Sequence, residues 1–257
     1  MSRENHVHTK EDLITFQSYP LSLKIALSKA RIRAWYNHFG GNVYVSFSGG
    51  KDSTVLLHLV RSMYPEVPAV FVNTGLEYPE IQIFARGHEN TTVLRPEMSF
   101  VDVIKKYGYP AISKEVSECV YQARMSIKSG KTKYTYRLKK LNGELTAPDG
   151  TPSRYNMSKW KFMLDAPFDI SNKCCDIMKK KPSKKYEKET GRAPFIATMA
   201  SESKLREQKW LQNGCNGFNA IRPTSQPLSF WTDNDILTYL LTYLRRSLLL
   251  RLRRDCR

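Results

Sequence analysis

The sequence predicts an α/β fold in which helices cover both faces of an open, mostly parallel sheet. Short apolar runs at residues 43–47, 69–72 and 91–94 are typical of buried strands, and amphipathic helical patterns separate them. Strands joined through helices pair in parallel with right-handed connections, so each face of the sheet receives helices. A chain of 257 residues with 41% hydrophobic content can bury such a core without disulfides or metal.

The helices expected around these strands have recognisable ends. In chain order they are residues 21–35, residues 54–63, a segment beginning near residue 79, and a helix from residue 99 to residue 108. Gly40 and Gly41 end the first of them. Ser99 and Asp102 have the spacing of an N-cap and an acidic third residue, and Gly108 closes that helix.

The chain is expected to divide into unequal parts. They are an N-terminal helical segment at 1–40, a main α/β domain at 41–244 with a helical C-terminal part, a central insertion at 124–169, and an Arg-rich tail at 245–257. Turn residues at 142–143 and 148–150 predict a small hairpin in the insertion, which is a candidate lid over the substrate. The insertion contributes four candidates for stacking on a base, unless they pack on its own basic stems: Tyr134, Tyr136, Tyr155 and Trp160.

The formal net charge of +17 indicates a polyanionic partner, either a nucleic acid or a small phosphorylated molecule. Basic residues concentrate at 128–140, 173–188 and 245–257, and the alternative is that these runs are solvated faces. The five cysteines lack the regular spacing of a disulfide framework, and the first ten residues do not read as a signal peptide. No apolar stretch reaches the ~20 residues of a membrane span. We therefore expect a soluble protein of the reducing cytoplasm.

The most specific signal is the loop after the first strand: Ser48, Gly49, Gly50, Lys51, Asp52 and Ser53. Both glycines are expected to adopt backbone conformations closed to other residues and to leave room for an anion. Hydroxyl groups, the lysine and the following helix N-terminus then suit the loop to phosphate or pyrophosphate. The pattern G-x-x-x-x-G-K-[ST] of another phosphate loop is absent, because Val45 and Asp52 occupy two of its positions. This argues against a kinase or GTPase, and a glycine turn without a ligand is the remaining alternative.

Taken with motifs further along the chain, this loop resembles that of the phosphoadenosine phosphosulfate (PAPS) reductases, a family among the PP-loop ATP pyrophosphatases. The further motifs are 71–75 with Glu77 and Glu80, 173–175 with Lys179, Lys180 and Pro182, 201–203 with Arg206, and 230–239. The resemblance spans roughly residues 25–244. It implies a Rossmann-like sheet of the adenine nucleotide alpha-hydrolase type.

The resemblance also implies roles for individual residues. Residues 48–53 would bind the phosphate or sulfate end of ATP or PAPS, with Lys51 and Asp52 as candidates for catalysis. Asn73, Thr74, Gly75 and Glu80 would line the nucleotide site, and Lys179, Lys180 and Arg206 would contact phosphates. A solvated basic face is the alternative for the two lysines. An ion pair with Glu202, one turn earlier, is the alternative for Arg206.

The chain departs from the family pattern in its cysteines. The C-terminal Glu-Cys-Gly-Leu-His type of segment, which holds the nucleophilic thiol in PAPS reductases, is absent, and Cys256 lacks the neighbouring glycine and histidine. Cys174 and Cys175 would be half of an iron-sulfur site, but no C-x-x-C follows them. Before residue 245 Lys outnumbers Arg 23 to 12, whereas the tail contains only Arg. We hypothesise that the family reading frame is lost near Arg245, a natural Arg-rich helix being the alternative.

Three functions remain open. In the first, the loop holds a sulfonucleotide while a thiol, lost from this chain or carried by a partner protein, removes sulfite. In the second, the loop holds the phosphates of ATP with magnesium, and a substrate, for which a nucleic acid is one candidate, is adenylated for sulfur transfer. In the third, the chain is a nucleotide-binding module without catalysis.

Overall fold

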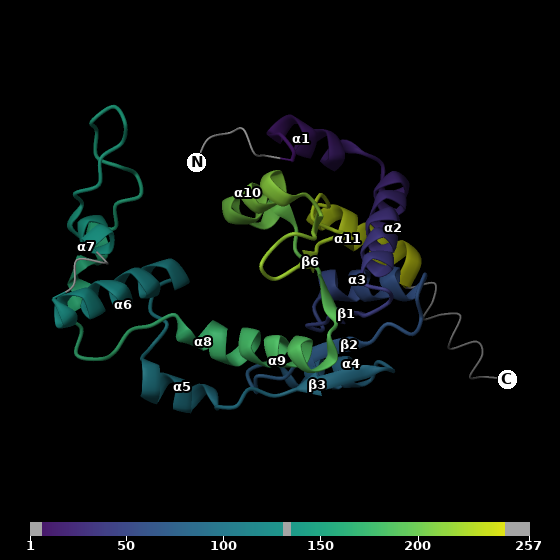
Figure 1. The fold of residues 1–257 in the computed structure, drawn as a ribbon, viewed down its shortest axis with the longest axis horizontal. Helices are drawn as coiled ribbons and strands as arrows, with labels where there is room; N and C mark the ends of the chain where they lie inside the picture. The colour runs from purple at the N-terminus through teal and green to yellow at the C-terminus, as the bar shows by residue number, and fades with distance from the viewer. Residues whose placement is uncertain (1–6, 131–134, 245–257) are drawn as a thin grey trace. The chain divides into compact units, whose positions relative to one another are not determined.

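The computed structural model describes residues 7–130 and 135–244. Its strands are β1 (Val43–Ser46), β2 (Ala69–Val72), β3 (Thr91–Leu94), β4 (Ala193–Ile196), β5 (Asn216–Gly217) and β6 (Thr224–Ser225). Its helices, labelled in Figure 1 where there is room, are α1 (Lys10–Ser18), α2 (Leu21–His38), α3 (Lys51–Arg61), α4 (Pro79–Arg86), α5 (Phe100–Tyr107), α6 (Lys114–Ser129), α7 (Thr135–Asn142), α8 (Lys173–Cys175), α9 (Lys181–Thr190), α10 (Lys204–Asn213) and α11 (Asp233–Tyr239). Shorter 3-10 or π segments are η3 (Ser158–Asp165), η4 (Asp176–Lys180), η5 (Ala200–Glu202) and η6 (Leu240–Leu244). The predicted Arg-rich tail, with Cys256, and Tyr134 lie outside the described residues.

The six strands form one sheet in the order β3-β2-β1-β4-β6-β5. Every pairing is parallel except that of β5 with β6. This confirms the predicted α/β class with an open, mostly parallel sheet. The three strands expected from the sequence occur, the second and third with the predicted bounds.

The burial of consecutive residues shows how the sheet is covered. Val43, Tyr44 and Val45 of β1 are all buried, although neighbouring side chains in a strand point to opposite faces. Both faces at the centre of the sheet are therefore shielded from water, as is usual for parallel sheets. β3 lies at one edge, and none of its residues is fully buried.

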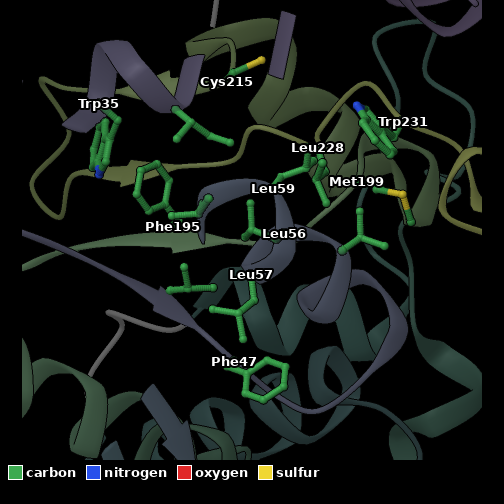
Figure 2. Close-up of a cluster of buried hydrophobic side chains, with 14 of the residues drawn as sticks. Trp35, Phe47, Leu56, Leu57, Leu59, Phe195, Met199, Cys215, Leu228 and Trp231 are labelled. Atoms are coloured by element: carbon green, nitrogen blue, oxygen red, sulfur yellow. The ribbon is translucent and has the colours of Figure 1, made fainter. Parts of the chain in front are cut away.

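The core is organised around α3, the helix that follows the candidate phosphate loop. Figure 2 shows Leu56, Leu57 and Leu59 of this helix in one cluster with Phe195 of β4 and Trp35 of α2. Seven of the helix's eleven residues are buried, which is the pattern of a helix with neighbours on several sides. Full burial of each large apolar side chain contributes about 1.5–3 kcal/mol. The loop is therefore followed directly by a helix that is packed in the hydrophobic core.

The C-terminal helix α11 is anchored by a buried ion pair. Asp235 accepts a hydrogen bond of 2.7 Å from Lys24 Nζ of α2, and both side chains are nearly inaccessible to water. The same carboxylate accepts hydrogen bonds from the backbone and hydroxyl of Thr232, the N-cap of α11. Asp235 lies in the segment 230–239 that resembles the family, and this residue thus has a structural role in this chain.

The described chain separates into two compact units. The first, which we call the sheet unit, comprises the residues up to 73, residues 77–94 and those from 184 onward. The second unit comprises residues 74–76 and 95–183, and the predicted insertion 124–169 lies within it. The division falls inside α9.

The second unit has its own small core, built on α6. Val116, Val120 and Ala123 of α6 are buried with Leu141 of α7 and Met163 of η3. Backbone hydrogen bonds at 147–151 and 145–153 and a bridge between residues 146 and 152 confirm the predicted hairpin. The Ser99 cap and the glycine end of α5 are also confirmed. Among the described residues, none of the helices is both long and apolar enough to span a membrane.

Candidate functional site

The candidate loop follows β1, the strand at which the order of strands in the sheet reverses. From β1 the chain moves outward through β2 to β3, and it later returns to the other side of β1 as β4. In open α/β sheets, ligands bind outside the carboxyl ends of the strands at this switch point. Residues 48–53 occupy that position, because they connect β1 to α3.

The loop is held by the hydroxyl groups of its two serines. Ser53 Oγ accepts a hydrogen bond of 3.2 Å from the backbone N–H of Ser48 and donates one of 2.9 Å to the carbonyl of Gly50. The two hydroxyl oxygens lie 3.1 Å apart. Thr54 Oγ1 also donates to the Gly50 carbonyl, at 2.9 Å. These contacts fix the turn with its hydroxyl groups at the start of α3.

Only one of the two glycines needs to be a glycine for its backbone angle. Gly49 has φ +75°, and a Cβ there would lie 2.8 Å from Ile81 Cγ2 of α4. Gly50 has φ −78° and ψ 163°, an extended conformation that any residue adopts, and its Cβ would meet nothing closer than 3.4 Å. The expectation that both glycines adopt restricted conformations is therefore wrong for Gly50.

Helix α3 begins at Lys51, three residues earlier than predicted, because Gly50 is its N-cap. In the described structure this cap makes no side-chain hydrogen bond to the first turn. The first N–H groups of an α-helix have no partner within the helix, and they carry the positive end of the helix dipole. The amides of residues 51–53 thus offer an anion several donors on a rigid support.

Two carboxylates hold the ammonium group of the loop lysine. Lys51 Nζ lies 2.5 Å from Asp233 Oδ1, at the start of α11, and 2.9 Å from Asp52 Oδ1. Hydrogen bonds to Asp233 and then to Asp52 raise the pKa of Lys51, so it remains charged at neutral pH. The side chain of Asp233 is 72% exposed. Asp233 is a site residue that sequence reasoning missed, although its position at the start of an acidic helix after Trp231 was an available signal.

The residues predicted to follow the second strand fall in different environments. Asn73 is buried, and its side-chain amide donates to Gln82 Oε1 at 3.0 Å. Glu80 is exposed in the first turn of α4. Thr74 and Gly75 belong to the second unit, where Thr74 Oγ1 accepts from the backbone of Leu76 at 3.3 Å. The Asn73 amide is therefore already used in fixing the segment between β2 and α4.

The predicted phosphate contacts outside the loop have mixed surroundings. Arg206 forms an ion pair with Glu202, as the alternative interpretation expected. Glu202 Oε2 also accepts from the backbone of Met199 at 2.7 Å. Lys179 is exposed in η4 of the second unit, and Lys180 pairs with Asp176 at 3.7 Å.

The tandem cysteines lie at the junction of α8 and η4, in the second unit. Cys175 is exposed, whereas burial and the neighbouring thiol raise the pKa of Cys174. Burial also raises the pKa of the other two described cysteines, Cys119 and Cys215, which supports their interpretation as inert thiols. Among the described residues, no three His, Cys, Asp or Glu side chains come close enough to share a metal. The described residues therefore do not fit a four-thiolate cluster.

The loop offers a better fit to magnesium bound together with a nucleotide. Mg²⁺ in nucleotide sites is usually held by one or two carboxylates, several waters and the substrate phosphates. Asp52 and Asp233 share one lysine nitrogen as a hydrogen-bond donor, so their carboxylates lie close together beside the loop. They are the two residues that would hold the ion.

Comparison with known proteins concerns a stretch of the chain that contains the loop and spans parts of both units. Residues 42–119 match the model of the phosphoadenosine phosphosulfate reductase domain family. Curated PAPS reductases are similar over short segments: that of Buchnera aphidicola is 33% identical over 86 residues, covering 32% of this chain and 35% of that protein. The enzyme of Alkalilimnicola ehrlichii is 34% identical over 82 residues, covering 30% of this chain and 34% of that protein.

Two further similarities are weaker or shorter. An uncharacterised protein of Methanocaldococcus jannaschii is 31% identical over 72 residues, which cover 26% of this chain and 18% of that protein. A crystal structure of PAPS reductase from Candida auris, in complex with phosphate, aligns over 91% of this chain and 86% of that one, with 14% identity and a TM-score of 0.45. The matched segments thus span no more than about a third of the curated relatives. The match of residues 42–119 confirms the family resemblance predicted from the sequence.

Proposed function

Residues 42–119 belong to the phosphoadenosine phosphosulfate reductase domain family, and from that premise we propose that this chain binds an adenosine sulfonucleotide at residues 48–53. The phosphate or sulfate end of the ligand lies on the amides of the first turn of α3. Lys51 supplies the positive charge and Ser48 supplies a hydroxyl donor, while the Ser53 hydroxyl holds the turn by donating to the Gly50 carbonyl.

One observation carries the proposal. Helix α3 begins directly after the Gly49 turn, at the switch point of the sheet, and no side chain of its N-cap residue bonds to the N–H groups of its first turn. The amides of the first turn and the lysine are preorganised, because the helix behind them is buried on most sides. Donors fixed in advance lose little entropy when a ligand binds. The site therefore favours a compact anion with several oxygens, such as a phosphate or a sulfonate.

The chemistry proposed for this site is reductive release of sulfite, with a dithiol as the reductant. A thiolate attacks the sulfonate sulfur, the sulfur–oxygen bond to the nucleotide breaks, and the sulfonate passes to the thiol. A second thiol then attacks the first sulfur, so that sulfite leaves and a disulfide forms. In our proposal a thiol-carrying partner protein supplies both thiols. The loop's part is to hold the nucleotide and to stabilise negative charge as the bond breaks.

Calorimetric titration with PAPS tests the proposal. Replacing Lys51 by Ala removes a charged hydrogen-bond donor worth about 1.5–3 kcal/mol, so the dissociation constant should rise roughly 10- to 100-fold. Lys188→Ala is the matched control, because Lys188 is exposed on α9 outside the loop. Asp233→Asn removes a competitor of the ligand for Lys51 and should leave the affinity unchanged or higher. Equal dissociation constants for Lys51→Ala and Lys188→Ala would refute the loop as the binding site.

A second candidate function is ATP pyrophosphatase chemistry, and the pair of carboxylates at Asp52 and Asp233 favours it. These two residues would hold magnesium on the phosphates of ATP, while the loop binds the departing pyrophosphate. The adenylated substrate would then be an acceptor for sulfur, for which a nucleic acid is one candidate. Pyrophosphate release from ATP and magnesium, with and without added RNA, separates the two functions. Release in the wild type that is lost in Asp52→Asn would favour the second, and PAPS binding without release would favour the first.

A further inference from the structure

A polar cavity of about 320 Å³ lies in the second unit, between α6 and the segment that runs from Asn172 into η4. This volume is at the lower end of the range for small-ligand sites. The lining residues are Lys114, Glu118, Tyr121, Gln122, Asn172, Lys173, Asp176 and Lys180. All of them belong to the second unit, so the cavity is complete within one compact body.

The acidic groups of this cavity are engaged by their neighbours. Glu118 accepts hydrogen bonds from Gln122 and from Asn172, each of 3.1 Å, and its carboxylate lies 3.7 Å from the guanidinium of Arg137. Asp176 pairs with Lys180 at 3.7 Å. The negative charge of Glu118 is therefore stabilised by two amide groups and a guanidinium group of the protein itself.

Two of the cavity's three lysines are not paired with a carboxylate of the described chain. Lys114 and Lys173 form no ion pair with any described residue. The ammonium group of Lys173 lies 5.9 Å from the centre of the Tyr121 ring, close to the distance of a cation–π contact. The cavity thus places a flat aromatic side chain beside ammonium groups that can receive an anion.

The whole second unit has the charge balance of a polyanion-binding surface. Residues 95–183 contain 18 of the 41 basic residues but only nine of the 24 acidic ones. Every cation–aromatic pair between described residues also lies in this unit, including Arg137 over Tyr136, Arg154 over Tyr155 and Lys159 over Trp160. Basic grooves with interleaved aromatic rings bind single-stranded nucleic acids through phosphates and stacked bases.

We propose that this cavity binds a nucleotide unit, with its phosphate on Lys114, Lys173 and Lys180 and its base on the ring of Tyr121. The unit comes either from a free mononucleotide or from a single strand. The stacking is tolerant of base identity, because every base presents a π face. The cavity belongs to the second unit and residues 48–53 to the sheet unit, and the proposal does not rest on the function of the loop.

The test measures binding of fluorescein-labelled decauridylate by anisotropy, in a full chain carrying Lys51→Ala so that the loop does not contribute. Replacing Lys114, Lys173 and Lys180 together by Gln should weaken binding at least 30-fold. It should also reduce the slope of log K against log salt by about 0.7, since the three lysines share one phosphate and each phosphate contact contributes ~0.7 for a single strand. Tyr121→Leu should weaken binding about tenfold at unchanged salt slope.

The matched control replaces Lys105, Lys128 and Lys161 by Gln, which removes the same charge from exposed positions of the same unit outside the cavity. This control should change affinity less than threefold. Competition with uridine 5′-monophosphate then identifies the source of the nucleotide unit. If the monophosphate displaces the labelled strand when its concentration equals that of the strand's nucleotide units, the ligand is a free nucleotide. If it does not displace the strand, the ligand is a single strand. Equal losses in the two triple variants, or no binding of either probe to the parent chain, would overturn the proposal.

Discussion

The turn at Gly49 offers a sharp test of how the loop is built. In Gly49→Ala, the alanine must either adopt the backbone angle φ +75°, which residues with a Cβ rarely adopt, or shift the backbone. Either change costs about 1–3 kcal/mol. The new Cβ would also lie 2.8 Å from Ile81 Cγ2, an overlap that adds about 1–3 kcal/mol if the surroundings do not yield. We expect a loss of roughly 2–6 kcal/mol in the free energy of unfolding, the sum of these two costs, and weaker nucleotide binding in the protein that remains folded.

Gly50→Ala is the control, because its backbone is extended and its Cβ would meet only Ser48 Oγ, at 3.4 Å. Its stability should change by less than about 1 kcal/mol, since alanine restricts the unfolded chain but is a poorer N-cap than glycine, and the two effects oppose each other. Urea unfolding followed by circular dichroism measures both variants. The steric part is isolated by a double-mutant cycle with Ile81→Ala, which removes Cγ2 and should restore part of the loss. Equal stabilities of Gly49→Ala and Gly50→Ala would refute this reasoning.

Two further predictions concern stability in the sheet unit. Asp235→Ala leaves the ammonium of Lys24 buried without its partner and should cost about 3–5 kcal/mol, whereas Asp233→Ala, at an exposed pair, should cost less than about 1 kcal/mol. Similar losses in urea unfolding would show that the buried pair is not special. Burial lowers the pKa of His8, which stacks on Trp210 at 4.4 Å, so the unfolded chain binds this proton more readily than the folded one. The free energy of unfolding should therefore be at its full value above about pH 6.5 and should fall as the pH drops below it. His8→Phe should reduce this loss. Identical pH profiles of the two proteins would contradict the assignment.

The regular elements follow closely from local sequence because their signals are local. The runs at Ala69–Val72 and Thr91–Leu94 are apolar or β-branched and bounded by turn residues, and both strands begin and end where predicted. Helix α3 was predicted to begin at residue 54 but begins at Lys51, because the apolar periodicity on which the prediction depended starts only after its first turn. Periodicity detects a buried face, and the first turn of a helix at a ligand loop does not need one.

The candidate site shows the same division. The sequence by itself determined the loop at 48–53, its family and its position after a parallel strand, since these depend on neighbouring residues and on the rule of right-handed crossovers. Only the tertiary structure decided that Gly49 rather than Gly50 has the restricted angle, and that a side chain at Gly49 would collide with Ile81, 32 positions away. It alone brought Asp233 to Lys51, 182 residues apart, and closed a lysine-lined cavity around Tyr121. Such contacts arise from how the chain returns on itself, and no local pattern of residues encodes that path.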